Sequence, residues 1–454
     1  MQGGGRTRQK AGAEPLDAFT LARSDFPAGF LFAAATSAYQ IEGHAYGGAG
    51  ETHWDTFARE PGRVANGENG AFACDHYHRW REDLDFIAQA GFDAYRFSTS
   101  WARIMPDGVK INPEGLDFYD RLVDGMLERG LKPMATLYHW ELPEALSRRG
   151  GWTVREIPER FAEFASRVGR RLGDRLFSTA PVNEPWCVAW LSHYDGQHAP
   201  GRCELPLAAR AMHHVALAHG LALEALRAEG VGNIGAVCNL EHALPATDAA
   251  PDRIAAERYD GLYNRWFPGA FLRGAYPDDI LEGLEVHLPG NWRDDMTVIS
   301  APIDWFGINY YTCQRLRGEP GEWPNIGIAD GPPPKTAMGW EIDPEGLGIL
   351  LRRIAEDYTK DLPLFVTENG MAAPDLPGRP DHDRIGYLDA HLDEARRAIE
   401  DGVPLRGYTF WSLLDNYEWA WGYDKRFGLI HVDFETFKRT PKASYHALAR
   451  AMAG

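Results

Sequence analysis

Eight short runs of apolar or β-branched residues limit what this 454-residue chain can fold into more than any other feature. They occupy residues 29–38, 93–100, 133–139, 176–184, 233–240, 303–311, 362–368 and 405–413. Between them, apolar residues recur at steps of three and four, as at Phe161, Phe164 and Val168, which predicts amphipathic helices. Strands that are apolar on both faces and alternate with helices indicate a parallel sheet. The sequence therefore predicts an α/β fold, a single-domain (β/α)8 TIM barrel with long βα loops.

The predicted barrel covers residues 25–454, because residues 1–24 are polar and Gly-rich and are expected to form a disordered extension. A second helical pattern follows Leu347, Leu350 and Ile354, and Asn112-Pro113-Glu114 is typical of a helix start. Connections at 41–75 and 312–340 are too long for simple turns, and loops of this length are usually functional or disordered.

Charge and cysteine content exclude several classes of protein. A net charge of −18, from 47 basic and 65 acidic residues, argues against nucleic acid and anionic membranes as partners. The five cysteines are odd in number and form no CxxC pair, which argues against a disulfide framework and against a zinc site. No apolar run has the length of a membrane span or of a signal peptide. We expect a cytoplasmic protein, and its oligomeric state does not follow from these features.

Two glutamates stand where predicted strands end. Glu368 follows the apolar run of residues 362–367 and precedes Asn-Gly, and Glu184 lies between Asn183 and Pro185 at the end of the fourth run. Either residue alone could simply open a surface loop. In a barrel, however, the carboxyl ends of the strands carry the active site, so both side chains would reach one cavity. A pair of opposed carboxylates is what the hydrolysis of a glycoside requires.

With these glutamates in place, the chain resembles glycoside hydrolase family 1, of the bacterial β-glucosidase kind, from about Ser24 to its end. The resemblance is carried by ATSAYQIEG (35–43), ACDHYHRW (73–80), YRFSTSWARIMP (95–106), LYHWELP (137–143), NEP (183–185), GINYYT (307–312), VTENG (366–370), WSLLDNYEWAWGY (411–423) and RFGLIHVDF (426–434). These stretches occur in the family's order along nearly the whole chain.

The resemblance implies that Glu184 is the acid/base and Glu368 the nucleophile of a retaining hydrolase. Retention requires the two carboxyl groups to lie about 5 to 5.5 Å apart, so that their repulsion keeps Glu184 protonated while Glu368 is ionised. Arg96, Tyr311 and Asn309 are implied as supports of the nucleophile. Without the resemblance, Arg96 could be a structural ion pair and Tyr311 a packing residue.

The resemblance also implies a set of sugar-binding residues: Gln40, His139, Asn183, Glu418 and Trp419, with Trp411 as the platform under the ring and Trp340 as the platform on the leaving-group side. Amide, imidazole and carboxylate groups can bind neighbouring sugar hydroxyls in pairs. A lone histidine or tryptophan would more often belong to a core. The chemistry needs no metal or cofactor, and the histidines at 76–78 and 213–214 lack the spacing of a metal site.

Residues near the C-terminus bear on the substrate. Family members that act on 6-phosphosugars usually have Ser where this chain has Glu418 and Tyr where it has Phe427, and only Lys425 of that set is retained. A carboxylate would repel a phosphate. The resemblance thus implies a retaining, exo-acting hydrolase of terminal non-reducing β-D-glucosyl residues in oligosaccharides, such as those from cellulose, or in aryl and alkyl glucosides. Galactosides and fucosides, transglycosylation, or a non-catalytic sugar-binding relative are the alternatives.

The chain departs from the family pattern mainly in places expected to surround the cavity mouth. Glu141 stands where Asp is usual, and residues 186–201 contain Cys187, Tyr194 and Asp195, together with His193, at variable positions. We expect these residues to bear on the leaving group.

Overall fold

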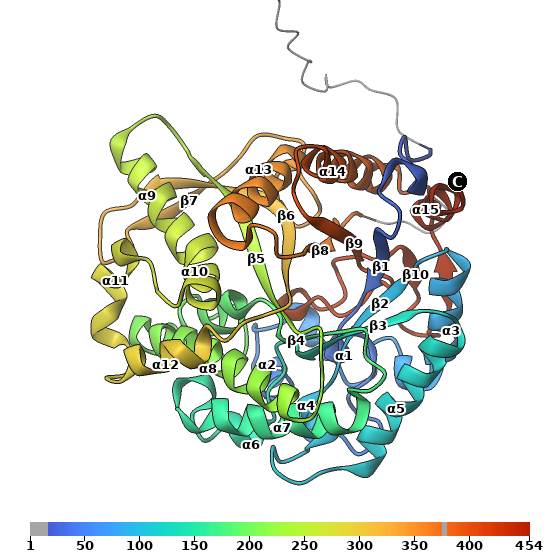
Figure 1. Cartoon of the computed structure of the whole chain (residues 1–454), viewed down its shortest axis with the longest axis horizontal. Helices are drawn as coiled ribbons and strands as arrows, with labels where there is room; N and C mark the ends of the chain where they lie inside the picture. The colour runs from blue at the N-terminus through green and yellow to red at the C-terminus, as the bar shows by residue number, and fades with distance from the viewer. Residues whose placement is uncertain (1–16, 375–378) are drawn as a thin grey trace, which may run out of the picture.

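Eight parallel strands close into a barrel at the centre of the computed structural model, which describes residues 17–374 and 379–454 (Figure 1). Each predicted run overlaps one strand: β1 (Leu31–Ala35), β2 (Ala94–Ser98), β3 (Lys132–Tyr138), β4 (Ser178–Val182), β5 (Gly235–Pro245), β6 (Trp305–Gly318), β8 (Leu364–Asn369) and β9 (Leu405–Trp411). Neighbours follow the order β4-β3-β2-β1-β9-β8-β6-β5. Parallel bridges from Thr179 to Ile234 and from Asn183 to Val237 join β4 to β5 and complete the ring. The predicted TIM barrel is confirmed.

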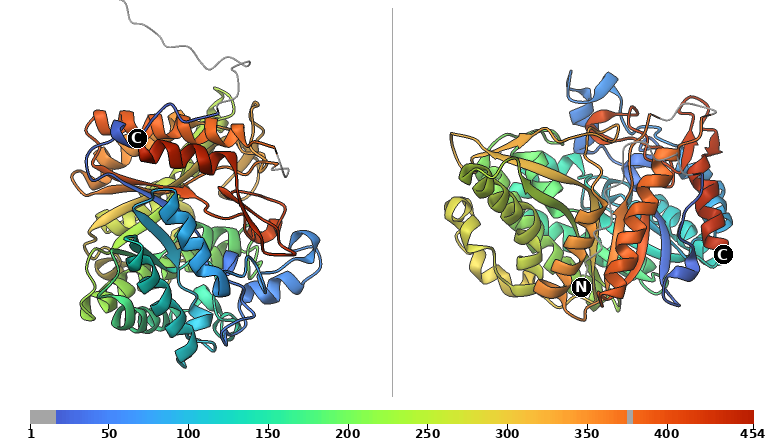
Figure 2. Two further views of the ribbon diagram at one scale, coloured as in Figure 1. Left: turned by 90° about the vertical axis from the view of Figure 1, so that its right-hand side faces the viewer. Right: turned by 90° about the horizontal axis from the view of Figure 1, so that it is seen from above.

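Helices surround the barrel, as Figure 1 and the view from above in Figure 2 show. They are α1 (Ala38–Ile41), α2 (His53–Arg59), α3 (His76–Gln89), α4 (Trp101–Ile104), α5 (Pro113–Glu128), α6 (Glu144–Ser147), α7 (Glu156–Leu172), α8 (Leu205–Ala228), α9 (Ala250–Asp260), α10 (Trp266–Arg273), α11 (Asp278–Leu284), α12 (Trp292–Ile299), α13 (Pro344–Ile354), α14 (His382–Glu400) and α15 (Ala443–Ala453). A small antiparallel pair, β10 (Ile430–Val432) and β11 (Arg439–Pro441), lies outside the barrel sheet.

The predicted helix around Phe161 is α7, and its sequence explains why it forms. Phe161, Phe164 and Leu172 fall on one face and are buried against the sheet and α8. The first turn carries glutamates and the last turn carries Arg170 and Arg171, which matches the direction of the helix dipole.

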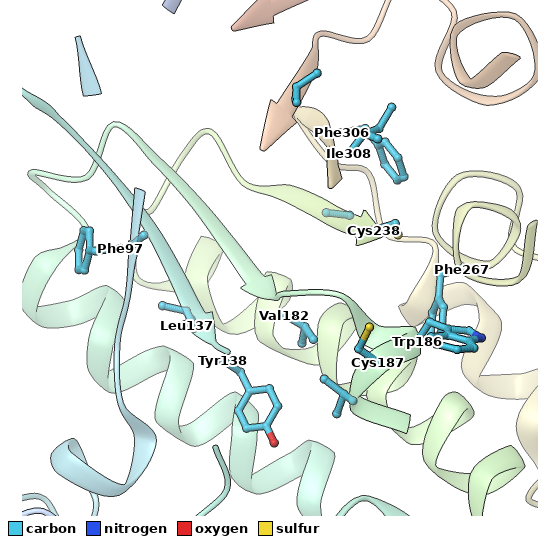
Figure 3. Close-up of a cluster of buried hydrophobic side chains, with 14 of the residues drawn as sticks. Phe97, Leu137, Tyr138, Val182, Trp186, Cys187, Cys238, Phe267, Phe306 and Ile308 are labelled. Carbon is cyan, nitrogen blue, oxygen red and sulfur yellow. The ribbon is translucent and has the colours of Figure 1, made fainter. Parts of the chain in front are cut away.

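The strands separate a hydrophobic layer from the barrel interior. Cys238 and Ile308 belong to the buried apolar cluster between strands and helices (Figure 3). The next residue along each strand, Asn239 and Asn309, lines the cavity of the barrel instead. Because successive side chains of a strand point to opposite faces, each apolar residue fixes the direction of its polar neighbour. The core thereby orients the side chains of the site.

The long connection at 312–340 is shorter than the sequence indicates. Strand β6 continues to Gly318 and pairs in antiparallel fashion with β7 (Ile326–Ala329), so part of this segment is an extended hairpin beyond the barrel rim. The connection at 41–75 likewise contains α2 and the short turn η2 (Ala65–Gly67).

The other two predicted helices are present, and the structure adds one detail to each. Asn112 does precede the first residue of α5, but its side chain donates to the carbonyl oxygens of Gly47 (2.7 Å) and Arg103 (2.9 Å) and does not cap the helix. It holds the preceding loop in place instead. The pattern beginning at Leu347 forms α13 and then widens into a π-helical turn, η7 (Ala355–Thr359).

The predicted N-terminal extension overlaps the folded unit. Its first sixteen residues lie outside the described ranges, whereas residues 17–24 contact the barrel's outer layer beside α14 and α15 (Figures 1 and 2). The backbone NH and hydroxyl of Thr20 donate to Asp389 at 2.8 and 2.7 Å, and Arg23 pairs with Asp93 at 2.9 Å. Over the two described ranges, no helix combines the length and apolar character that crossing a membrane requires.

Candidate active site

A cavity of about 370 Å³ opens at the carboxyl ends of the strands, where a TIM barrel carries its active site. Most of the predicted site residues line it: Glu184, Glu368, Tyr311, Asn309, His139, Trp340, Trp411, Glu418 and Trp419. The remaining three, Gln40, Arg96 and Asn183, are buried and bonded to residues of this wall. The barrel therefore brings the whole predicted set together.

Glu368 lies near the end of β8 and is only 3% exposed. One carboxylate oxygen accepts a hydrogen bond from the Arg96 guanidinium and the other accepts one from the Tyr311 hydroxyl at 2.6 Å. The second nitrogen of Arg96 donates to Asn183 Oδ1 at 2.6 Å. A buried carboxylate needs such compensation, because desolvation otherwise disfavours its charge. Arg96 and Tyr311 thus lie where the sequence predicts supports for Glu368.

The Asn-Gly that follows Glu368 is buried, although this residue pair is typical of turns. Asn369 still belongs to β8, and its amide donates to the Tyr310 carbonyl (2.7 Å) while accepting from the Tyr408 hydroxyl (2.6 Å). A Cβ at Gly370 would lie 1.7 Å from the carbonyl oxygen of Trp411. Glycine is therefore required for the close approach of β8 to the end of β9.

Glu184 follows β4 with a backbone φ of 50°, a left-handed conformation that is uncommon for a residue with a side chain. Its NH donates to the Val237 carbonyl at 3.2 Å, which fixes this conformation across the β4–β5 junction. Trp140 and Trp419 also have positive φ and line the same cavity. Strained residues of this kind concentrate at functional sites.

The surroundings of Glu184 favour its protonated form. Its Oε1 atom accepts a hydrogen bond from Asn309 Nδ2 at 2.6 Å, a neutral donor. Burial, and then the charge of Glu368, raise the pKa of Glu184 to about 8, although the Asn309 amide and the Cys187 thiol partly oppose this. At neutral pH Glu184 is consequently a proton donor.

Asn309 has a different partner from the one expected. It is the register neighbour of Glu368 across β6 and β8, but its amide donates to Glu184 and, at 3.1 Å, to Asn183 Oδ1. The Thr367 hydroxyl donates to its carbonyl oxygen at 2.6 Å, which fixes the orientation of the amide. Arg96, Asn183 and Asn309 therefore form a continuous hydrogen-bonded link from Glu368 to Glu184.

A second polar group in the cavity centres on Glu418. Gln40 Nε2 donates to Glu418 at 3.4 Å and to the Tyr417 carbonyl at 2.8 Å, and its own carbonyl oxygen accepts from Ser37. Burial, followed by the charges of Glu368 and Glu184, raises the pKa of Glu418 to about 8. Gln40 therefore orients this carboxyl group toward the cavity.

His139 lines the cavity between Asn183 and the tryptophans of the wall. Its Nε2 lies 3.3 Å from Asn183 Nδ2, whereas Nδ1 is buried and has no hydrogen-bond partner among the described residues. Burial, and then Arg96, hold the pKa of His139 well below its usual value, so the ring is neutral. The ring lies nearly parallel to Trp411 and Trp419, with centroids 5.6 and 6.2 Å apart. An aromatic wall with an unpaired ring nitrogen suits a sugar, which offers flat apolar faces and hydroxyl groups.

The residues at which this chain departs from the family pattern lie in different parts of the structure. Cys187, Tyr194 and Asp195 line the main cavity as expected. His193 lies instead in a second cavity of about 280 Å³ together with His53. Glu141, expected near the mouth, is 1% exposed and does not line either cavity, and burial raises its pKa well above the usual value.

Two cavity residues on β5, Asn239 and Glu241, do not follow from the sequence prediction. The predicted run stops at residue 240, whereas β5 extends to Pro245. Two polar residues two positions apart, one near the end of the apolar run and one just beyond it, would have been the signal, because they share one face of a continuing strand.

No group of three His, Cys, Asp or Glu residues within 17–374 and 379–454 is arranged to hold a metal ion.

Comparisons with known proteins agree with this geometry. The family model described as Glycosyl hydrolase family 1 matches residues 22–452. Beta-glucosidase A of Thermotoga maritima is 45% identical over 429 residues, covering 92% of this chain and 96% of that protein. A bifunctional beta-D-glucosidase/beta-D-fucosidase of Bifidobacterium breve is 44% identical over 463 residues, covering 94% and 98%. The solved structure of a family 1 β-glucosidase from T. maritima in complex with isofagomine lactam matches with a TM-score of 0.90 at 42% identity, over 94% of this chain and 98% of that one. This chain belongs to glycosyl hydrolase family 1.

Proposed function

We propose that this chain is a retaining, exo-acting β-glucosidase in which Glu368 is the nucleophile and Glu184 the acid/base. The observation that carries the proposal is the unequal support of two buried carboxyl groups in one cavity. An arginine and a tyrosine hydroxyl compensate the charge of Glu368, while Glu184 is bonded to a neutral amide and has its pKa raised to about 8. Pairs of carboxyl groups whose environments differ in this way divide acid and base roles between them.

In the first step, an oxygen of Glu368 attacks the anomeric carbon as the bond to the glycosidic oxygen breaks. Glu184 gives its proton to that oxygen, so the leaving group departs as a neutral alcohol. The sugar is then held as an ester of Glu368, and the charge of that carboxylate is gone.

In the second step, the pKa of Glu184 falls because the neighbouring negative charge has disappeared. Its carboxylate accepts a proton from water, the water oxygen bonds to the anomeric carbon, and the ester bond to Glu368 breaks. Glucose leaves with its anomeric configuration retained, and both carboxyl groups return to their starting states.

An unphosphorylated glucoside is the substrate that the cavity favours. The Glu418 carboxyl group can exchange hydrogen bonds with neutral hydroxyls, and it offers no positive charge to a phosphate. Within the described residues, no lysine or arginine lines the cavity, and Lys425 donates to the Ala337 carbonyl at 2.7 Å outside it. β-Fucosides are the second candidate, because the B. breve relative is named for both activities. Transglycosylation would use the same residues, with a sugar hydroxyl replacing water in the second step.

We infer that the enzyme works in the cytoplasm on short sugars such as those from cellulose. All five cysteines are unpaired, which fits a reducing compartment. Cell fractionation with an antibody, together with initial rates on cellobiose, tests both points.

The test of the mechanism uses Glu184→Gln and Glu368→Gln, with Glu229→Gln as the control. Glu229 pairs with Arg170 on the outer surface, so its variant makes the same charge change far from the cavity. Rates on an aryl β-glucoside with a poor leaving group should fall by roughly 10²- to 10⁴-fold in Glu184→Gln and by at least as much in Glu368→Gln. Near-normal rates in either variant would show that the assignment is wrong.

Azide separates the two roles. With Glu184→Ala, azide should attack the glucosyl ester and yield the β-glucosyl azide. With Glu368→Gly, it should replace the missing nucleophile in one displacement and yield the α-azide. The same anomer from both variants would contradict the division of roles.

A further inference from the structure

The outer half of the cavity, meaning the part lined by Asn239, Glu241, Cys187 and Tyr263, contains a carboxyl group that the proposed mechanism does not use. Glu241 lies on β5, two residues after Asn239, so the two side chains share one face of the strand, and both line the cavity. Cys187 and Tyr263 lie in the same part of the wall. This half is the side from which a leaving group would depart.

The strand geometry directs Glu241 into the cavity. Leu240 pairs with Tyr310 and His242 pairs with Cys313, so Glu241 alone faces two residues of β6 across a bulge. Bulges next to active sites often re-aim a side chain. The backbone of Glu241 is fixed as well, because the Asn264 amide accepts from its NH at 3.0 Å and donates to its carbonyl at 2.8 Å.

Glu241 has acceptor capacity beyond its protein partners. The Tyr259 hydroxyl donates to Oε2 at 2.5 Å. Burial raises the pKa of Glu241 to about 7, although the Tyr259 and Tyr263 hydroxyls partly oppose this by favouring the ionised form. A carboxylate can accept about four hydrogen bonds. Capacity therefore remains for a donor on a ligand, and a positive charge there would favour the ionised form of Glu241.

Asn239 supplies an independent indication of a ligand. Its side chain is 4% exposed, and neither its amide nitrogen nor its amide oxygen has a hydrogen-bond partner among the described residues. Buried polar groups are nearly always bonded, so two unpartnered amide atoms on a residue that lines the cavity point to a polar partner supplied from the cavity. Asn239 and Glu241 can contact the same group because they are two residues apart on one face.

The sign of charge in this half is uniform. No described lysine or arginine lines the cavity, and the other carboxyl group at this rim is that of Asp195, which is exposed. Aromatic rings form much of the remaining wall, with Trp186 and Tyr263 centroids 4.3 Å apart. A flat leaving group that carries a positive charge matches both properties, whereas an anion would meet only carboxylates.

We propose that Glu241, with Asn239 beside it, selects aromatic leaving groups that present a protonated amino group. The inference rests on the proposed function, because it concerns the leaving group of that same reaction. Glu241 acts on specificity and takes no part in bond breaking.

The test compares three aryl β-D-glucosides that carry an aminomethyl, a hydroxymethyl or a carboxymethyl substituent, each in meta and para forms. The methylene group insulates the phenol, so the three leaving groups depart with similar ease. At pH 7 the wild type should show the highest kcat/KM with the aminomethyl compound. We expect a preference of about tenfold over the hydroxymethyl compound, because charge-assisted hydrogen bonds are the stronger ones, and the carboxymethyl compound should be the poorest.

Substitutions locate the source of this preference. Glu241→Gln keeps the shape of the side chain and removes its charge, so the ratio between aminomethyl and hydroxymethyl compounds should fall to about one. Glu241→Asp retains the charge and should retain most of the ratio. Asp195→Asn is the matched control, which removes the same charge from the exposed rim and should change the ratio by less than about twofold.

The outcomes separate this inference from the proposed function. Equal kcat/KM for the three compounds in the wild type would overturn the inference and leave the β-glucosidase assignment intact. The inference would also be overturned if Asp195→Asn lost the preference for the aminomethyl compound as completely as Glu241→Gln does. The preference would then come from the general electrostatic field of the cavity. If no aryl glucoside is hydrolysed, the proposed function fails, and calorimetric binding of the same compounds should still follow the same order.

Discussion

The inner and outer halves of the cavity are built differently. In the inner half, around Glu368, the side chains of Arg96, Asn183 and Asn309 are bonded to one another and to both catalytic candidates. In the outer half, Asn239 has two unpaired amide atoms. A network whose members are bonded holds one geometry, which suits chemistry that is the same for every substrate. The unpaired amide atoms of Asn239 are free to bond to a ligand, so contacts of this kind can decide which leaving groups are preferred.

This comparison predicts that substitutions in the inner half lower the rate for every glucoside, whereas substitutions in the outer half change the ranking of glucosides. The predictions below test the distinction in order of decreasing effect.

Arg96→Met should have the largest effect among the residues that do not touch the reacting atoms. It removes the cation beside Glu368 and the donor to Asn183, and breaking a buried ion pair costs about 3 to 5 kcal/mol. We expect kcat/KM to fall by roughly 10²- to 10³-fold for all aryl glucosides alike. Steady-state rates on a series of leaving groups provide the measurement.

Arg96→Lys is the matched variant, because it keeps the charge but cannot span Glu368 and Asn183 with two donors. Its activity should lie between those of the wild type and Arg96→Met. A change in the ranking of leaving groups in either variant would contradict the separation of the two halves.

Glu418→Gln should lower kcat/KM for glucosides by roughly ten- to a hundredfold, because one acceptor for the sugar hydroxyls is replaced by an amide. The same variant should be more resistant to heat at alkaline pH. The pKa of Glu418 is raised to about 8 in the folded protein, above the value near 4.5 of an unperturbed glutamate. The folded state therefore binds more protons between these values, and this group makes stability decrease as pH rises through that window.

Thermal unfolding at pH 5 and pH 8.5 checks the sign. The gain in Tm of Glu418→Gln over the wild type should be larger at pH 8.5, because glutamine cannot ionise. Glu229→Gln is the contrasting control, since pairing with Arg170 and Ser166 lowers the pKa of Glu229 to about 2 and its loss should not stabilise the protein at either pH. Equal gains for Glu418→Gln at both pH values would count against a raised pKa at this position.

Asn309→Ala should act chiefly on Glu184. Its amide lowers the pKa of Glu184 by bonding to the ionised form, so its removal raises that pKa further above about 8. The alkaline limb of kcat/KM, where the acid loses its proton, should move to higher pH, and kcat should fall about tenfold. Thr367→Val removes the hydrogen bond that orients the Asn309 amide but leaves the amide in place. It should therefore move the alkaline limb of kcat/KM to higher pH by a smaller amount. A limb that moves to lower pH would contradict this role.

Most residues of the inner half could be predicted from the sequence and few of the outer half, for a physical reason. Glu184 and Glu368 follow strands whose apolar runs are visible in the sequence, and the barrel places all such ends together. By contrast, β5 and β6 extend beyond the barrel rim, where neither strand is apolar on both faces. The periodicity that predicts a buried strand is absent there, so Glu241 could not be placed.

Two further differences come from contacts between distant segments. Asn369-Gly370 is a residue pair typical of turns. Glycine is required at position 370, however, because the carbonyl oxygen of Trp411, some forty residues later, leaves no room for a Cβ. Asn309 lies in register with Glu368, but the orientation of its amide depends on Thr367 and on the position of Glu184 across the barrel. Local patterns predict the strand and its end, and they do not predict which of two neighbours an amide will bind.

Trp340→Ala should have the smallest effect and the one most confined to the outer half. Trp340 is partly exposed and packs near Tyr311 and Phe427, with centroids 5.7 and 6.2 Å away. Loss of an aromatic contact of about 1 kcal/mol should raise KM for aryl glucosides about fivefold. The second chemical step has no leaving group present, so kcat for a 2,4-dinitrophenyl glucoside limited by that step should change less than KM. Trp421→Ala, at the exposed mouth, is the control with a weaker expected effect. If Trp340→Ala lowered kcat for every glucoside as strongly as KM rose, the platform would belong to the inner half, and the division of the cavity would have to be redrawn around it.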